Sequence, residues 1–256
     1  MALSFRRILT HYRVFRLQFK TLRDLPSISF LRALLYFPIW IKKQSPQCSP
    51  LNDKMPWVHF DARRYIKKII SNKSIVFEFG AGGSTLFFLE RAKKVYTVEH
   101  NYEWYNKVAA LVNQDVEHSA KWVSVFVSPG EQLIKENSNE ELMVLASEPD
   151  NYLSTDHSVL GKNFFGYASS IDMYDDNYFD IVFIDGRARP SCIKHSIQKV
   201  KENGFLILDN SDRAYYFEHT SKLLDKSGFR KIYNFVGPGP YGPVFWGTTI
   251  FQKKRN

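Results

Sequence analysis

The stretch VFEFGAGGST, residues 76–85, decides the fold. It begins with the composition of a buried strand, which carries an acidic residue, Glu78, near its end, and glycines follow directly. Glycines let the backbone turn tightly and approach a ligand, and a helix that begins at Ser84 or Thr85 presents free amide groups to an anionic group. The stretch therefore predicts a strand, a ligand-binding turn and a helix in direct succession.

Strand-like and helix-like patterns alternate through the rest of the chain. Helical patterns cover residues 60–70 and begin again near Ser84, Tyr102, Pro190 and Ala214. Such alternation predicts an α/β domain in which helices cover both faces of a parallel sheet. The strand-like runs are residues 74–79, 94–98, 122–127, 180–184 and 204–208.

The pattern changes near the C-terminus. Residues 231–236 and 244–253 are strand-like, and the Gly- and Pro-rich residues 237–243 leave no room for a crossover helix between them, so the two runs are expected to pair antiparallel. The predicted fold class is a Rossmann-like doubly wound sheet of five parallel strands plus a C-terminal antiparallel hairpin, with an N-terminal helical arm. Residues 128–178 form an unusually long connection, with a short helix expected around residues 167–174.

Basic residues are concentrated at the N-terminus. The chain of 256 residues has a formal charge of +9, and residues 1–43 hold nine basic side chains and one acidic one, Asp24. The rest of the chain is nearly neutral. This asymmetry assigns the basic charge to a terminal arm, and it predicts no nucleic-acid partner for the folded body.

Residues 1–55 are predicted to form a basic amphipathic helical arm and a linker over residues 42–53, and residues 56–256 the main domain. Apolar residues recur at helical spacing after Phe5, and residues 27–41 are too short an apolar stretch to cross a bilayer. Three interpretations are open: peripheral contact with an anionic membrane, packing on the domain or a partner subunit, and an organelle presequence.

Cysteine usage indicates a reducing compartment. Cys48 and Cys192 are the two cysteines of the chain, and they form no C-x-x-C pair. Neither a disulfide framework nor a cysteine zinc site is therefore predicted. A cytoplasmic location is expected, with the membrane-peripheral arm as the open alternative, and the oligomeric state is left open.

The acidic residues near the ends of the first two strands suggest a cofactor. Glu99 ends the second strand, 21 residues after Glu78. A carboxylate in that position can accept hydrogen bonds from both hydroxyls of a ribose. Together with Gly80 and Gly82, the two acids predict a pocket for a ribose-bearing cofactor.

Acidic residues also end the fourth and fifth strands. Asp185 and Asp209, the latter followed by Asn210, lie at the edge where open α/β sheets bind ligands. Their oxygens would suit a hard cation such as Mg²⁺. In the alternative interpretation these acids cap helices or contact the cofactor, and Asp212 is the candidate base if no metal is present.

These motifs resemble those of the class I S-adenosylmethionine-dependent methyltransferases, which have an acid-x-Gly-x-Gly motif after the first strand and a second acid after the second. The resemblance covers roughly residues 56–253. It implies that Glu78 lies near the methionine amino group and that Glu99 binds the ribose. The cofactor-binding residues that it implies are Glu78, Gly80, Gly82, Ser84, Thr85 and Glu99.

Asp185, Asp209 and Asn210 are similar to the metal triad of the magnesium-dependent O-methyltransferases. In that group a divalent ion binds the acceptor hydroxyl and lowers its pKa. The lysine base of the catechol-type enzymes is replaced here by Ala188. Arg187 and Arg189 flank this position, and both are poor bases because a guanidinium stays charged.

A closer similarity is to a bacterial-type methyltransferase group whose acceptors are largely undefined. Its motifs are Pro-Trp, Glu-Phe-Gly-x-Gly-Gly-Ser-Thr, Asp-Gly-Arg-x-Arg, Asp-Asn-Ser-Asp-Arg and Gly-Pro-Gly-Pro-Tyr. They occur here at residues 56–57, 78–85, 185–189, 209–213 and 237–241.

The resemblance implies methyl transfer from S-adenosylmethionine to a hydroxyl oxygen of a small molecule or glycan, with Mg²⁺ as an expected aid. The predicted catalytic residues are Asp185, Asp209 and Asp212.

An NAD-dependent oxidoreductase is a second hypothesis, disfavoured because the third glycine of G-x-G-x-x-G falls on Thr85. A third is a non-catalytic cofactor-binding module anchored by the arm. The aromatic residues expected to wall the acceptor pocket, or else to pack in the core, are Tyr215, Tyr216, Tyr241 and Trp246.

Overall fold

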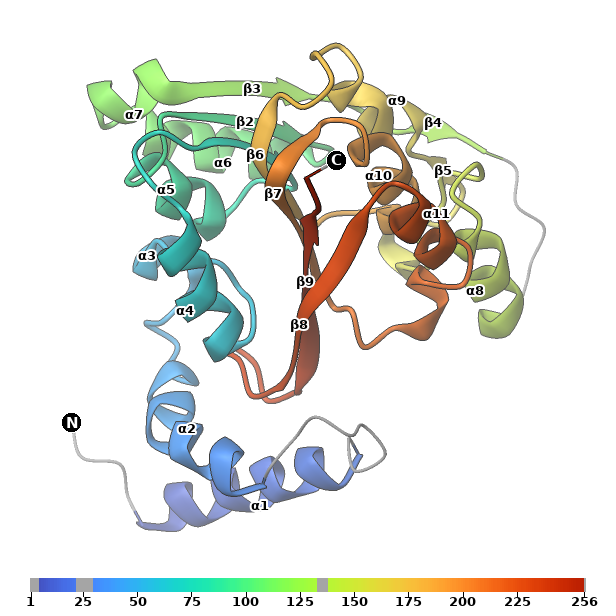
Figure 1. The fold of residues 1–256 in the computed structure, drawn as a ribbon. Helices are drawn as coiled ribbons and strands as arrows, with labels where there is room; N and C mark the ends of the chain where they lie inside the picture. Colours follow the sequence, from blue (N-terminus) through green and yellow to red (C-terminus); the bar gives the residue numbers. More distant parts are fainter. Residues whose placement is uncertain (1–4, 22–29, 133–137, 256) are drawn as a thin grey trace.

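A twisted sheet of seven strands forms the centre of the protein, in the order β3-β2-β1-β6-β7-β9-β8 (Figure 1). The computed structural model describes residues 5–21, 30–132 and 138–255. The strands of the sheet are β1 (Ile75–Phe79), β2 (Lys94–Glu99), β3 (Trp122–Phe126), β6 (Phe179–Ile184), β7 (Val200–Asp209), β8 (Phe229–Gly237) and β9 (Trp246–Lys253).

The pairing of these strands confirms the predicted fold class. β1 pairs in parallel with β2 and β6, β2 with β3, and β6 with β7. β9 lies between β7 and β8 and pairs antiparallel with both. The short connection from β8 to β9 allows only this antiparallel return. The insertion of β9 beside β7, with β8 at the sheet edge, was not predicted from the sequence.

Helices cover both faces of the sheet and bury two cores. α4 (Phe60–Ile69), α5 (Gly83–Leu89) and α6 (Tyr102–Val112) lie on one face. α9 (Phe165–Ala168), α10 (Arg189–Ser196) and α11 (Thr220–Lys226) lie on the other. Neighbouring strand residues alternate between the two cores, as Val182 and Phe183 of β6 do, because successive side chains of a strand point to opposite faces.

The long connection after β3 contains more structure than the sequence predicted. Two-residue strands, β4 and β5, pair antiparallel as a small separate sheet. The expected short helix corresponds to α9 followed by a 3-10 turn, η2. The elements not yet given are α7 (Val116–Lys121), β4 (Gly130–Glu131), α8 (Asn139–Ser147), η1 (His157–Val159), β5 (Lys162–Asn163), η2 (Ser169–Ile171) and η3 (Ala214–Tyr216).

The segment expected to be a linker contains a short helix, α3 (Pro50–Asp53), that packs on the start of α5. Ser49 caps it, because its side chain accepts a hydrogen bond from the backbone N–H of Asn52. A Cβ on Gly83 would lie 2.1 Å from the carbonyl oxygen of Pro50. The approach of α3 therefore requires a glycine at this position.

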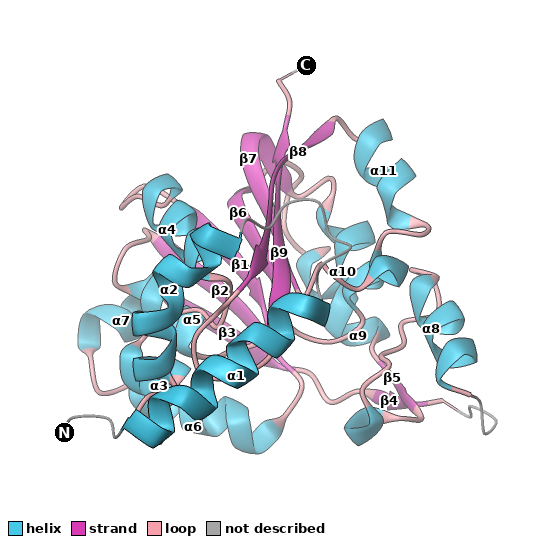
Figure 2. Cartoon of the chain, turned by 90° about the horizontal axis from the view of Figure 1, so that it is seen from below, coloured by secondary structure: helices cyan, strands magenta, loops and turns pink. Residues whose placement is uncertain are grey.

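The N-terminal arm consists of α1 (Phe5–Thr21) and α2 (Phe30–Lys43), which lie below the sheet, toward the viewer in Figure 2. Phe15 and Trp40 are buried and contact Phe245, with ring centroids 4.8 and 6.4 Å apart. Gln44 Nε2 donates a hydrogen bond to the carbonyl of Gly242. The arm therefore packs on the domain, through the connection between β8 and β9.

Packing on the domain is one of the three interpretations of the arm. Contact with an anionic membrane stays a prediction. The two helices expose the apolar side chains of Leu17, Leu35 and Ile39, which such a contact would cover. Within the described ranges, no helix combines the length and the apolar character that a membrane span needs.

Replacing Phe245 with alanine should release the arm from the domain. Loss of a buried phenylalanine typically costs about 3–5 kcal/mol, and here the lost contacts are those to Phe15 and Trp40. Limited trypsin digestion should then cut after the arm's basic residues faster than in the wild type. The control is Val244→Ala at an exposed neighbouring position. Equal cleavage of all three proteins would contradict this packing.

Candidate functional site

A pocket of about 590 Å³ opens at the carboxyl ends of β1, β6 and β7. The glycine loop, residues 80–84, forms one wall, and residues 241–244 together with Trp246 form the opposite one. Its floor carries Asp185, Asp209 and Asn210. The strand ends that the sequence singled out thus meet in one cavity, as expected for an open α/β sheet.

Glu78 lies fully buried beneath the glycine loop. Its Oε2 accepts hydrogen bonds from the hydroxyls of Thr85 at 2.6 Å and Thr97 at 3.2 Å. Its Oε1 is buried and has no hydrogen-bond partner among the described residues. Burial raises the pKa of Glu78 to about 8, although nearby hydroxyls oppose the shift. A buried acceptor atom without a partner is costly, so its presence suggests a ligand group that completes it.

Gly80 and Gly82 of the loop differ in whether the fold requires a glycine at that position. Gly80 has a φ of +96°, and a Cβ there would lie 2.9 Å from the carbonyl oxygen of Asp185, so the fold itself requires glycine. Gly82 has an extended backbone, and a Cβ there would meet only the Ser84 hydroxyl, at 3.8 Å. No described residue lies close enough to require glycine at position 82, and the missing side chain leaves space in the pocket.

Thr85 occupies the position of the third glycine in the dinucleotide-binding motif. Its hydroxyl accepts a hydrogen bond from the backbone N–H of Gly82 at 2.9 Å and donates one to Glu78. The threonine therefore fixes the loop to the strand that precedes it.

Glu99 holds the glycine loop from the neighbouring strand. Its carboxylate accepts hydrogen bonds from the backbone N–H groups of Ala81, His100 and Asn101, each at 2.8 Å. Burial would raise the pKa of Glu99, but His100 and these amides hold it below its ordinary value. A carboxylate has about four acceptor positions. His100 Nδ1 also lies 2.9 Å from Oε1, so the remaining position is on Oε2, which among the described residues accepts from Ala81. The predicted contact with a ribose stays a prediction.

Arg189 joins the ends of β6 and β7. This buried side chain places Nη2 3.1 Å from Asp185 Oδ1, and its Nη1 donates to the carbonyl of Asp209. Its Nε donates to the carbonyl of Gly186 at 3.1 Å. The guanidinium therefore places a fixed positive charge between the two aspartates.

The two aspartates differ in their surroundings. Burial raises the pKa of Asp185 to about 6, while Arg189 opposes the shift. Burial and the charge of Asp185 raise the pKa of Asp209 well above its usual range. Asp209 Oδ1 accepts hydrogen bonds from Thr248 Oγ1 at 2.6 Å and Trp246 Nε1 at 3.0 Å. Asp209 therefore holds its proton more strongly than Asp185 does.

The predicted magnesium triad of Asp185, Asp209 and Asn210 does not fit a metal ion. Arg189 already supplies the positive charge between the aspartates, and a cation beside a buried guanidinium is unfavourable. One oxygen of Asp209 is also occupied by two donors. Over the described ranges, no group of three or more His, Cys, Asp or Glu side chains could hold a metal.

The structure does not bring Asp212 to the pocket. Its side chain is exposed, and Oδ1 accepts a hydrogen bond from the backbone N–H of Gly247 at 2.8 Å. Asp212 thus ties the turn after β7 to the start of β9. Ser84 does line the pocket, whereas the side chains of Glu78 and Thr85 lie beneath its wall.

Aromatic side chains complete the pocket. Tyr241 and Trp246, expected as walls, do line it, and Trp57 contacts both at centroid distances of 6.2 and 6.5 Å. Trp104 was missed, although it follows Glu99 closely in the sequence; its Nε1 donates to the carbonyl of Ala81 at 2.7 Å. Arg189 was noted only as a poor base, and its place in the Asp-Gly-Arg-x-Arg motif was the available signal.

No protein-family model matches the chain, and no curated protein sequence does. Similar solved structures include a methyltransferase candidate from Streptococcus mutans in complex with S-adenosylhomocysteine (SAH), at 12% identity over 74% of this chain and 94% of that chain, with a TM-score of 0.48. An rRNA methylase from Streptococcus thermophilus aligns at 11% identity, over 75% and 94% of the two chains, with a TM-score of 0.46.

A methyltransferase-like protein from Silicibacter pomeroyi aligns at 16% identity, over 75% of this chain and 84% of that one, with a TM-score of 0.46. Structural neighbours of the chain are thus methyltransferases of the class I fold.

Glu78→Gln should change how stability depends on pH. The folded protein holds the Glu78 proton up to about pH 8, whereas the ordinary pKa is 4.5. Folding therefore takes up a proton between these values, and the free energy of unfolding should fall as pH rises through this window. Glutamine does not titrate, so thermal unfolding of the ligand-free variant should show a smaller fall. Glu103→Gln, at an exposed position, is the control, and identical pH profiles for Glu78→Gln and the wild type would contradict the burial of a protonated Glu78.

The two loop glycines should respond differently to alanine. Gly80→Ala should destabilise the fold by about 1–3 kcal/mol, because alanine is strained at positive φ and its Cβ meets the Asp185 carbonyl. Gly82→Ala should leave the melting temperature nearly unchanged, because its methyl group enters the open pocket, with the Ser84 hydroxyl at 3.8 Å as its neighbour. Thermal unfolding measures both effects. Equal destabilisation by the two substitutions would contradict this difference between the glycines.

Proposed function

We propose that the pocket binds S-adenosylmethionine and that the protein transfers its methyl group to a hydroxyl oxygen of an acceptor. The observation that carries the proposal is the glycine loop between two buried carboxylates. Glu78 keeps an acceptor atom without a partner beneath the loop, and Glu99 fixes the loop from the next strand. Gly82 leaves the space above the loop open.

The chain offers a different group to each part of such a ligand. An ammonium group near the loop would favour the ionised form of Glu78, because an opposite charge offsets the cost of burial. Trp104, which is 36% exposed, presents an aromatic surface beside the loop for a nucleobase. The fourth acceptor position of Glu99 is the predicted partner of a ribose hydroxyl.

The acceptor is activated by this chain's own carboxylates. S-adenosylmethionine, when bound, supplies a methyl carbon whose bond to sulfur breaks as the acceptor oxygen bonds to it, and the electron pair stays on sulfur. Asp185 lines the pocket and is ionised above about pH 6, so it can accept the hydroxyl proton. Arg189 holds Asp185 in place. No step requires a metal at Asp185 and Asp209.

The NAD-dependent alternative fits the site less well. In the dinucleotide-binding motif the third glycine lets the helix pack closely on the strand. Thr85 occupies that position here, and its hydroxyl instead forms hydrogen bonds with the Glu78 carboxyl group and the backbone N–H of Gly82. The antiparallel β9 beside β7 also differs from an all-parallel dinucleotide-binding sheet. A non-catalytic cofactor-binding module would share the pocket and differ only in turnover.

Calorimetry of the purified protein tests the cofactor. SAH should bind saturably and far more tightly than NADH. Glu99→Gln should weaken SAH binding by about 1–3 kcal/mol, because the loop amides and the ribose hydroxyl both lose a charged hydrogen-bond acceptor. The exposed Glu103→Gln variant should bind like the wild type. Equal or tighter binding of NADH, or no binding of SAH, would refute the proposal. SAH binding without methyl transfer to any fraction of a cell extract would favour the non-catalytic module.

A further inference from the structure

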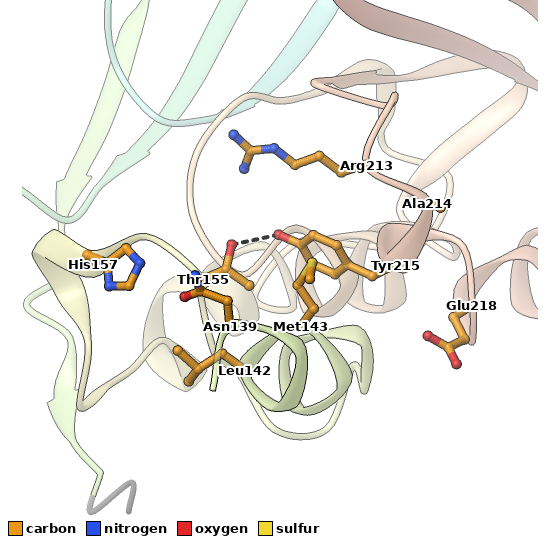
Figure 3. Close-up of a pocket in the computed structure, with 9 residues that line it drawn as sticks. All are labelled: Asn139, Leu142, Met143, Thr155, His157, Arg213, Ala214, Tyr215 and Glu218. Carbon is orange, nitrogen blue, oxygen red and sulfur yellow. Dashed lines mark hydrogen bonds between the residues drawn. The ribbon is translucent and has the colours of Figure 1, made fainter. Parts of the chain in front are cut away.

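A second and larger pocket, of about 770 Å³, lies on the α8 side of the domain (Figure 3). Leu142 and Met143 of α8 form an apolar wall, and His157 comes from η1. Tyr215 of η3 accepts or donates a hydrogen bond with Thr155 at 2.9 Å across it. The long connection after β3 therefore builds most of this pocket, which plays no part in the cofactor site described above.

A small polar cavity of about 70 Å³, called here the joining cavity, lies between the two pockets. It shares Arg213 and Tyr215 with the larger pocket. It shares Arg187, Arg189 and Asn210 with the pocket of the glycine loop. Because they share these lining residues, the three cavities lie next to one another, in a row from the α8 side to Asp185.

The joining cavity is lined by three guanidinium groups with unequal partners. Arg189 is fully engaged by Asp185 and two backbone carbonyls. Arg187 pairs with Asp156 at 2.8 Å through Nη2, but its Nε is buried and has no hydrogen-bond partner among the described residues. Arg213 donates to the Tyr216 hydroxyl at 3.0 Å, and none of the ion pairs of the described residues includes it.

The acidic side chains paired with these arginines balance two of the three guanidinium charges. Asp156 balances Arg187, and the ionised Asp185 balances Arg189. Figure 3 shows the guanidinium of Arg213 extending over the Thr155–Tyr215 hydrogen bond on the side of His157, whereas Glu218 lies on the opposite side of the pocket. An anion in this cavity could accept a hydrogen bond from Arg187 Nε and form an ion pair with the guanidinium of Arg213.

We propose that the acceptor carries an anionic group, a carboxylate or a phosphate, that binds between Arg187 and Arg213. This assignment rests on the methyl transfer proposed above. The body of the acceptor occupies the pocket beside α8, and its hydroxyl reaches Asp185 through the joining cavity. A neutral acceptor would leave the donors of Arg187 and Arg213 unsatisfied, so the arginines select acidic acceptors against neutral ones of the same shape.

Binding of small probes to the SAH-saturated protein tests this assignment. Glucuronic acid and glucose 6-phosphate carry the two candidate anions on one sugar, and glucose is the neutral match. Ligand-observed NMR should detect binding of at least one anionic probe and none of glucose. The probe that binds identifies the carboxylate or the phosphate as the group recognised. Arg213→Gln should weaken that binding by about tenfold, and Arg213→Lys should retain part of it.

The matched control is Arg230→Gln, which removes an exposed guanidinium from β8. It should bind the anionic probe like the wild type, and all variants should keep wild-type SAH affinity and circular dichroism. Absence of anion binding, equal binding of glucose, or an unchanged affinity in Arg213→Gln would overturn the acceptor assignment while SAH binding leaves the cofactor proposal intact. If the wild type binds no SAH, the proposed function fails, and the acceptor assignment fails with it.

Discussion

The burial of the Glu78 carboxylate beneath the glycine loop is the constraint on which the site depends. A buried carboxyl group needs hydrogen-bond partners, and Thr85 and Thr97 supply them from the following helix and the neighbouring strand. The loop must then pass over Glu78 closely enough that Gly80 meets the backbone of Asp185. At the same place β1 and β6 pair in parallel, and the backbone N–H of Asp185 donates a hydrogen bond to the carbonyl of Phe79 at 3.1 Å. The glycine loop above Glu78 therefore lies directly beside Asp185.

The opposite wall of the pocket depends on the N-terminal arm. The connection from β8 to β9 carries Tyr241 and Trp246 into the pocket and Phe245 away from it, into a cluster with Phe15 and Trp40. The arm thus packs against the connection that lines the pocket, in addition to carrying basic residues. Its apolar faces pack on the loop that lines the pocket, while Arg13 and Arg16 of α1 are exposed.

The periodic parts of the chain could be predicted from sequence, and the contacts between its acids and bases could not. Buried strands and the Pro- and Gly-rich hairpin connection leave a clear pattern, and so the sheet and the carboxylates at its edge were predicted. Short elements such as α3 and β4 leave none. Carboxylates near two strand ends could equally hold a metal or an arginine, and only the structure shows that Arg189 lies between Asp185 and Asp209. The position of Asp212, turned toward Gly247, likewise depends on the placement of β9.

The central claim is that the cavity between the glycine loop and the β8–β9 connection is an S-adenosyl site whose sulfur faces Asp185. A crystal structure of the protein with SAH tests it most directly. The account predicts the adenine beside Trp104, the ribose within hydrogen-bond distance of Glu99, and the sulfur on the side of the pocket that carries Asp185 and opens toward Arg187. SAH bound in the pocket beside α8, or with its sulfur directed away from Asp185, would contradict the account.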